Sequence, residues 1–63
     1  MSVEQFLKAH YCSDDLDKDQ IRHDCEHWER VGSNPEKFPN ADMEFIDRFT
    51  DAAIAYLALN DLR

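Results

Sequence analysis

The stretch that decides the fold is residues 41–62, ADMEFIDRFTDAAIAYLALNDL, the longest periodic segment of the chain. It contains neither glycine nor proline, and its apolar residues recur at steps of three and four, which places them on one face of a helix. From Ala52 to Leu59, eight consecutive apolar residues surround this helix. A helix that is apolar on all sides has to be covered on more than one side. Either the rest of the chain clasps it, or a second copy of the chain shares it.

Two shorter helices precede this segment, and each begins at a capping pattern. Ser2 and Gln5 form a capping box, and the apolar positions after them predict a helix over about 3–12. Asp17 begins a second helix over about 18–31, with a glutamine three residues later in the same pattern. The first helix is too short to be stable alone in water, so its apolar stripe has to dock on the last helix.

The loop between the second and the last helix holds both prolines, and the only glycine of the chain lies at its edge. Gly32 is expected to end the second helix, as a C-terminal glycine commonly does. Phe38 is expected to fill the core from the loop, and Trp28, the largest apolar side chain, is expected to lie in the core. Asn40 is a good N-cap for the last helix, which is predicted over about 41–61.

The fold class predicted from these signals is all-α, a single domain of three helices over residues 1–63 in which the last helix is the longest and central. No alternating pattern predicts a strand. A chain of this length buries only about 60% of its unfolded surface, so a partner chain, a metal or a disulfide is expected to add stability. The apolar content of 43% is enough for a folded core.

The charge balance of the chain restricts its partners. There are 14 acidic and 7 basic residues, which give a net charge of −7. This charge repels nucleic acid and anionic membranes, and it favours basic partners or simply solubility. Three helices could suggest helix-turn-helix DNA binding, but the second helix has more acidic than basic residues, the wrong sign for contact with phosphates. The apolar run 52–59 is also far shorter than the roughly 20 residues of a membrane span. We therefore expect no direct binding to nucleic acid or membrane.

A pair of histidines in the second helix is the one candidate metal site. His23 and His27 are four residues apart, which places two imidazoles on one helical face where they could bind zinc, nickel or copper. His10 and Cys12 could complete a set of four ligands. Cys25 lies between the two histidines in the sequence, but it belongs to the apolar seam and points elsewhere. Solvated histidines are the favoured interpretation, and a small metal-binding domain is the alternative; we predict no cofactor.

Nothing in the sequence predicts an enzyme. No glycine-rich loop could hold phosphate, and a chain this small rarely encloses a substrate pocket. Cys25 is expected to be an inert core residue, and Cys12 precedes a cluster of aspartates whose negative charge disfavours a thiolate nucleophile. The N-terminus has no signal-peptide pattern, so we expect a cytoplasmic protein with both thiols reduced, a Cys12–Cys25 disulfide being the alternative.

Two surfaces could bind other proteins. Tyr56, Leu57 and Leu59 belong to the all-round apolar run, and we expect two copies of the chain to share them in a homodimer. The acidic residues around the start of the second helix could instead imitate DNA phosphates and occupy the nucleic-acid site of a host protein. These acidic residues are Asp14, Asp15, Asp17 and Asp19. The predicted function is a protein-interaction module, with an acidic inhibitor of a nucleic-acid-binding protein as the alternative.

Two segments of the chain resemble known proteins: HYCSDDLDKDQIRHDCEHWERVG, residues 10–32, and FIDRFTDAAIAYLALNDLR, residues 45–63. With them the whole chain resembles the small early-region accessory proteins of lambda-like bacteriophages, which are encoded between the recombination and excision genes. The resemblance implies expression in the cytoplasm of a bacterial host and a role in adjusting host physiology through a host protein. It implies no catalytic or binding residues.

Overall fold

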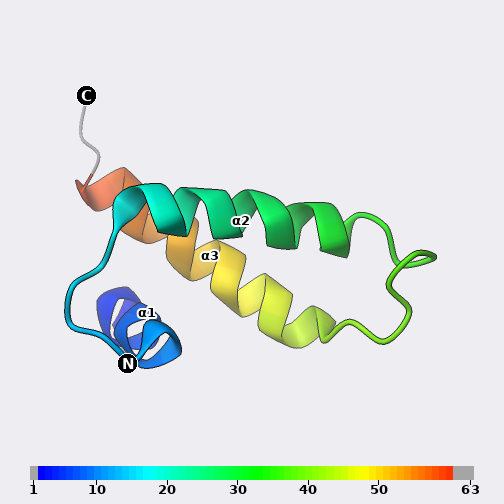
Figure 1. The fold of residues 1–63 in the computed structure, drawn as a ribbon, viewed down its shortest axis with the longest axis horizontal. Helices are drawn as coiled ribbons and strands as arrows, with labels where there is room; N and C mark the ends of the chain where they lie inside the picture. Colours follow the sequence, from blue (N-terminus) through cyan, green and yellow to red (C-terminus); the bar gives the residue numbers. More distant parts are fainter. Residues whose placement is uncertain (1, 61–63) are drawn as a thin grey trace.

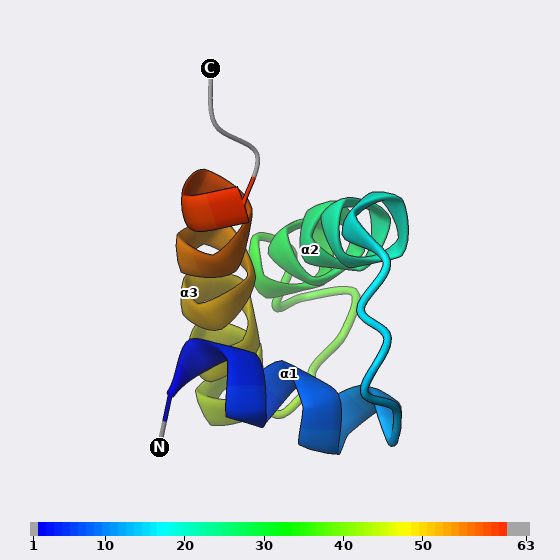
Figure 2. The ribbon, with the colours of Figure 1, turned by 90° about the vertical axis from the view of Figure 1, so that its left-hand side faces the viewer.

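The computed structural model describes residues 2–60 and contains three helices, α1 (Val3–Tyr11), α2 (Lys18–Gly32) and α3 (Met43–Asn60). α3 is the longest helix and packs against both others. α2 lies along α3 at a shallow angle, and α1 runs across it (Figures 1 and 2). The predicted all-α class and the central position of the last helix are therefore confirmed. The predicted extension of that helix to residue 61 lies outside the described residues.

The first two helices begin where the capping patterns predict. The Ser2 hydroxyl accepts a hydrogen bond from the Gln5 backbone N–H at 3.1 Å, and the Gln5 side chain accepts one in return from the Ser2 N–H at 3.3 Å. Asp17 caps α2 through one carboxylate oxygen, which accepts from the N–H groups of Asp19 at 2.9 Å and Gln20 at 3.3 Å. Each cap satisfies backbone donors that the helix itself leaves without partners.

The end of α2 differs from the expectation for Gly32. This glycine is the last residue of α2, and the helix ends at Ser33 in a right-handed conformation, where the Ser33 N–H donates to the Glu29 carbonyl at 3.0 Å. A Cβ atom at position 32 would lie 3.3 Å from Ile46 Cγ2, so the missing side chain lets α3 come close to α2. The left-handed residue is instead Cys12, with φ 54°, at the C-cap of α1.

The start of α3 also differs from the prediction, because Asn40 is not its cap. α3 begins at Met43, and the Asp42 carboxylate accepts a hydrogen bond from the Phe45 N–H at 3.1 Å. A turn over residues 38–41, closed by a 3.1 Å backbone hydrogen bond between its first and last residues, precedes this start. The turn keeps residues 38–41 outside the helix, and Asp42, which follows it, provides the capping bond.

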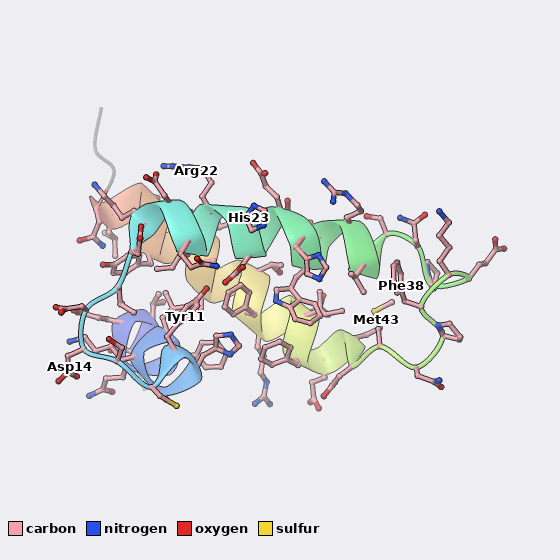
Figure 3. All side chains as sticks on the ribbon, viewed as in Figure 1. Tyr11, Asp14, Arg22, His23, Phe38 and Met43 are labelled. Atoms are coloured by element: carbon pink, nitrogen blue, oxygen red, sulfur yellow. The ribbon has the colours of Figure 1, made fainter. Side chains whose placement is uncertain are left out.

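The core lies between the three helices and centres on Phe49 of α3, Leu7 of α1 and Ile21 of α2, none of which has exposed surface. Trp28 is half-buried and packs edge-on against Phe45 with ring centroids 5.5 Å apart. Phe38 does not fill the core as expected, because 41% of its surface is exposed and its loop extends beyond the helices (Figure 3). The other members of the buried cluster are Cys25, Ala52 and Ala53.

Candidate functional site

The predicted acidic residues lie at the end of the molecule where α1 leads into α2, and we call Asp14, Asp15, Asp17 and Asp19 the acidic connection (Figures 1 and 3). All four are exposed. They are not equivalent, because Asp17 caps α2 and Asp19 forms an ion pair with Arg22 at 3.1 Å. Asp14 and Asp15 can be replaced without breaking either interaction.

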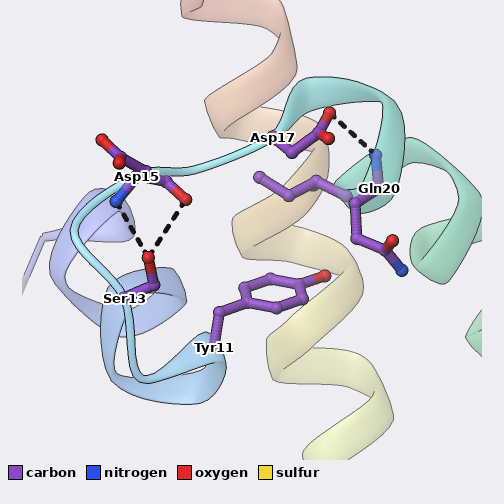
Figure 4. Close-up of a pocket in the computed structure, with 6 residues that line it drawn as sticks. Tyr11, Ser13, Asp15, Asp17 and Gln20 are labelled. Carbon is purple, nitrogen blue, oxygen red and sulfur yellow. Dashed lines mark hydrogen bonds between the residues drawn. The ribbon is translucent and has the colours of Figure 1, made fainter.

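A hollow of about 240 Å³ opens beside the acidic connection (Figure 4). Asp15 and Asp17 are among its lining residues, and no basic residue of the described part of the chain lines it. The Ser13 hydroxyl holds the connecting loop, because it accepts from the Asp15 N–H at 3.1 Å. The hollow therefore offers a negative environment suited to a lysine or arginine side chain of a partner. Its lining residues are Tyr11, Ser13, Asp15, Asp17, Gln20 and Ile21.

A hydrogen bond between Tyr11 and Asp24 joins α1 to α2. The Tyr11 hydroxyl donates to one oxygen of the Asp24 carboxylate at 2.6 Å, and the Gln20 amide donates to the other at 3.0 Å. The sequence patterns did not single out Asp24. The available signal was its spacing, since it lies three residues after Ile21 and four before Trp28, beside the apolar seam. Asp24 therefore has a structural role between two helices.

Four causes raise the pKa of Tyr11 above its ordinary value, the largest first: burial, the hydrogen bond that it donates to Asp24, the negative charge of Asp24, and an electrostatic contribution from Cys25. In the unfolded chain a tyrosine ionises near pH 10, whereas the folded protein keeps this proton at higher pH. Above about pH 10 the unfolded state therefore binds fewer protons than the folded state, and the free energy of unfolding falls as pH rises.

We predict that Tyr11→Phe removes much of this alkaline loss of stability. Urea unfolding curves of both proteins at about pH 8 and about pH 11 give the test. The wild type should lose more stability than the variant between the two values, because the variant has no ionisable hydroxyl at this position. An equal loss of unfolding free energy in both proteins would show that the Tyr11–Asp24 hydrogen bond does not cause the loss of stability at high pH.

The second half of α3 is covered on one side only. Tyr56 and Leu57, two of the three residues expected at a dimer surface, are half-buried and pack against the core. Leu59, the third, is 70% exposed. Ile54, which the sequence analysis did not single out, is 52% exposed. We define the α3 outer face as Ile54, Ala55, Ala58 and Leu59.

A mostly apolar groove of about 620 Å³ lies between the N-terminal half of α1 and α3. Val3 and Phe6 form its α1 side, and Ala52 and Ala55 form its floor on α3. Ala55 borders both this groove and the α3 outer face. Sequence periodicity could not reveal the groove, because its two sides are more than 40 residues apart in the chain. We call it the α1/α3 groove; Ser2, Arg48 and Asp51 complete its lining.

The three histidines have different surroundings and make different contacts. His10 packs against Phe49, with ring centroids 4.9 Å apart, and His27 lies edge-on to Trp28 at 5.0 Å. His23 is exposed on α2 (Figure 3). Within residues 2–60, no three His, Cys, Asp or Glu side chains gather where they could hold a metal ion. The four-ligand set of His10, Cys12, His23 and His27 is therefore not assembled in this part of the chain.

Both cysteines are free thiols in different environments. Cys12 is exposed at the end of α1, where its thiol donates to the Ala9 carbonyl at 3.7 Å. Cys25 is buried in the core, and burial, followed by the negative charges of Glu29 and Glu26, raises the pKa of its thiol. Cys25 therefore stays protonated and shielded from reagents.

Three comparisons with known proteins found no match. No family model, no curated protein and no solved structure matches the chain. Among residues 2–60, no helix has the length and apolar character needed to cross a membrane.

Proposed function

We propose that the chain is a small acidic protein-interaction module that forms a homodimer and acts on a host protein. The observation that carries this proposal is the exposed apolar surface of the α3 outer face. The core covers only one side of the run 52–59, and Ile54 and Leu59 project from the other side. Large apolar side chains in contact with water favour association, because burial of one leucine contributes about 1.5–3 kcal/mol.

The size of the chain supports self-association. A domain of 63 residues buries a small share of its surface on folding, and a second copy would add apolar area to the same core side chains. A symmetric dimer needs a surface that is complementary to itself, and a helix face of two large and two small side chains meets this need. Tyr56 and Leu57 belong to the core beneath this face, and Leu59 belongs to the face.

The resemblance to phage accessory proteins supports the second part of the proposal. It implies expression in the cytoplasm of a bacterial host and a role in adjusting host physiology, and we propose that this role is exerted through a host protein. The excess of acidic residues favours a basic target surface and disfavours direct contact with nucleic acid. We propose no catalytic step, since the described hollows are open to solvent and no activated nucleophile lines them.

Leu59→Glu is expected to convert the dimer into a folded monomer. The substitution places a charge on the α3 outer face and leaves the core unchanged, so helicity should stay within about 10% of the wild type. Light scattering at a series of concentrations measures the mass, and circular dichroism measures helicity. Asn40→Glu is the matched control, because it adds the same charge at an exposed loop position. A monomeric wild type, or a Leu59→Glu variant with unchanged dimer mass, would contradict the proposal.

An acidic inhibitor is the second candidate function, and the exposed Asp14 and Asp15 beside an acidic hollow favour it. In this case the acidic connection takes the place of nucleic-acid phosphates on a basic host protein. Binding would then weaken strongly with added salt, since exposed charges are screened within about 10 Å at 0.1 M.

The double variant Asp14→Lys and Asp15→Lys tests this candidate without damage to the fold, because it keeps the Asp17 cap and the Asp19–Arg22 ion pair. Affinity capture from bacterial lysate is compared for the variant and the wild type at low and high salt. We expect a captured protein to be lost with the double variant and released by salt. A protein that both chains retain at high salt would contradict the acidic-inhibitor function and indicate an apolar surface.

A further inference from the structure

The α1/α3 groove is a mostly apolar surface whose charged lining residues sum to zero net charge, although the protein as a whole is strongly acidic. Its lining contains Arg48 and Asp51, one charge of each sign, whereas the chain as a whole carries −7. The hollow beside the acidic connection is lined by two acidic residues, Asp15 and Asp17, instead. Two copies of a strongly acidic chain repel each other, and this repulsion is smallest where the facing surfaces have no local net charge. The groove therefore suits a second copy better than a basic partner.

An exposed side chain that could fill such a groove lies next to it on the same helix. Ala52, Ala55 and Leu59 follow one another at steps of three and four residues, so they share one stripe of α3. Leu59 lies one helical turn beyond the groove and projects into solvent with 70% of its surface exposed. One copy thus carries an apolar groove and, beside it, an apolar side chain without cover.

We propose that the α1/α3 groove receives Leu59 of a second copy, in a two-fold dimer of antiparallel α3 helices; this rests on the dimer of the proposed function. The two-fold axis passes beside Ala55, so the Ala55 residues of the two copies face each other. Antiparallel pairing about Ala55 places Leu59 of each copy opposite residues 51–52 of the other, where the groove opens. Each groove is filled and each Leu59 is covered, which is the reciprocity that a two-fold interface requires.

The dimensions of helices agree with this register. Helices with alanine at their contact approach to about 8 Å between axes, and Cα atoms lie about 2.3 Å from each axis. For helix axes about 8–10 Å apart, the two Cα atoms of residue 55 therefore come to within about 3.4–5.4 Å of each other. The Cα atoms of Ala58 in the two copies are displaced along the axis by three residues each, roughly 9 Å in total. A disulfide spans Cα atoms up to about 7 Å apart, so it can form at position 55 and not at 58.

Oxidative crosslinking of variants with one exposed cysteine tests the register directly. Ala55→Cys and the control Ala58→Cys are each made with Cys12→Ser, which removes the exposed native thiol; Cys25 stays buried. Mild oxidation is followed by non-reducing electrophoresis, and light scattering measures the mass of the same samples before oxidation. We expect Ala55→Cys to form a covalent dimer at least about tenfold faster than Ala58→Cys, because pairing raises the local thiol concentration. Addition of Leu59→Glu should abolish the difference.

The outcomes separate this inference from the proposed function. A dimer by light scattering in which Ala55→Cys reacts no faster than Ala58→Cys would leave the homodimer standing and overturn the antiparallel register at the groove. Samples that are monomeric before oxidation would overturn the dimer itself, and the register with it. A fast Ala55→Cys crosslink that survives Leu59→Glu would show that the helices pair without Leu59 in the groove.

Discussion

Replacement of Phe49 by alanine is expected to unfold most of the protein. Phe49 is fully buried at the centre of the core, with the rings of His10 at 4.9 Å and Phe45 at 5.9 Å. Truncation of a buried phenylalanine to alanine costs about 3–5 kcal/mol, through lost transfer energy and the cavity left behind. A 63-residue domain holds only about 3–9 kcal/mol in total. Urea unfolding followed by circular dichroism measures the loss.

Phe38→Ala is the matched control, because it makes the same chemical change in the loop. Phe38 is 41% exposed, so its truncation should cost less than about 1 kcal/mol. The pair therefore tests which phenylalanine belongs to the core. Equal losses of stability in the two variants would mean that Phe38 fills the core after all, as the sequence alone suggested.

Tyr56→Glu is expected to abolish folding, in contrast to Leu59→Glu. Tyr56 is half-buried against the core cluster, and a carboxylate placed there loses hydration without gaining a partner, at a cost of several kcal/mol. Leu59 lies three residues further along α3 and is mostly exposed, so the same new charge there stays hydrated. Helicity by circular dichroism at equal concentration distinguishes the two variants.

Tyr56→Phe serves as the control for ring packing, and it should stay within about 1 kcal/mol of the wild type. A Tyr56→Glu variant that is monomeric but keeps wild-type helicity would place Tyr56 at the dimer surface instead of the core. That result would restore the sequence-based view, in which Tyr56, Leu57 and Leu59 form one surface.

Local patterns were sufficient to predict the three helices. The capping box of Ser2 and Gln5 and the Asp17 cap are contacts between residues two or three positions apart, so the sequence contains all the information they need. The start of α3 shows the limit of such rules, because Asn40 and Asp42 are both good caps in isolation. In the structure Asn40 lies in the turn before α3, and Asp42, which follows the turn, provides the cap.

Part of the candidate site was predictable in the same way. The four residues of the acidic connection lie within six positions of the sequence, so they had to lie close together, and the run 52–59 had to be apolar on all sides. The sequence predicted the Asp17 cap, but it did not reveal that Asp19 forms an ion pair with Arg22, nor that Asp14 and Asp15 take part in neither of these contacts. That difference depends on where each carboxylate points, which composition does not contain.

The amino-acid sequence by itself determined the helices, their order and the net charge of −7. It also determined that the last helix is apolar on all sides over residues 52–59, which is more apolar surface than one neighbouring helix can cover. Tertiary structure decided which side of that helix is covered. Contacts between distant residues made this choice: Gly32 lets α3 approach α2 beside Ile46, and Tyr11 bonds Asp24 across two helices. With α1 and α2 on one side of α3, Leu59 and the α1/α3 groove face outward. Periodicity fixes only the faces of a single helix, and the packing of several helices fixes which face meets water.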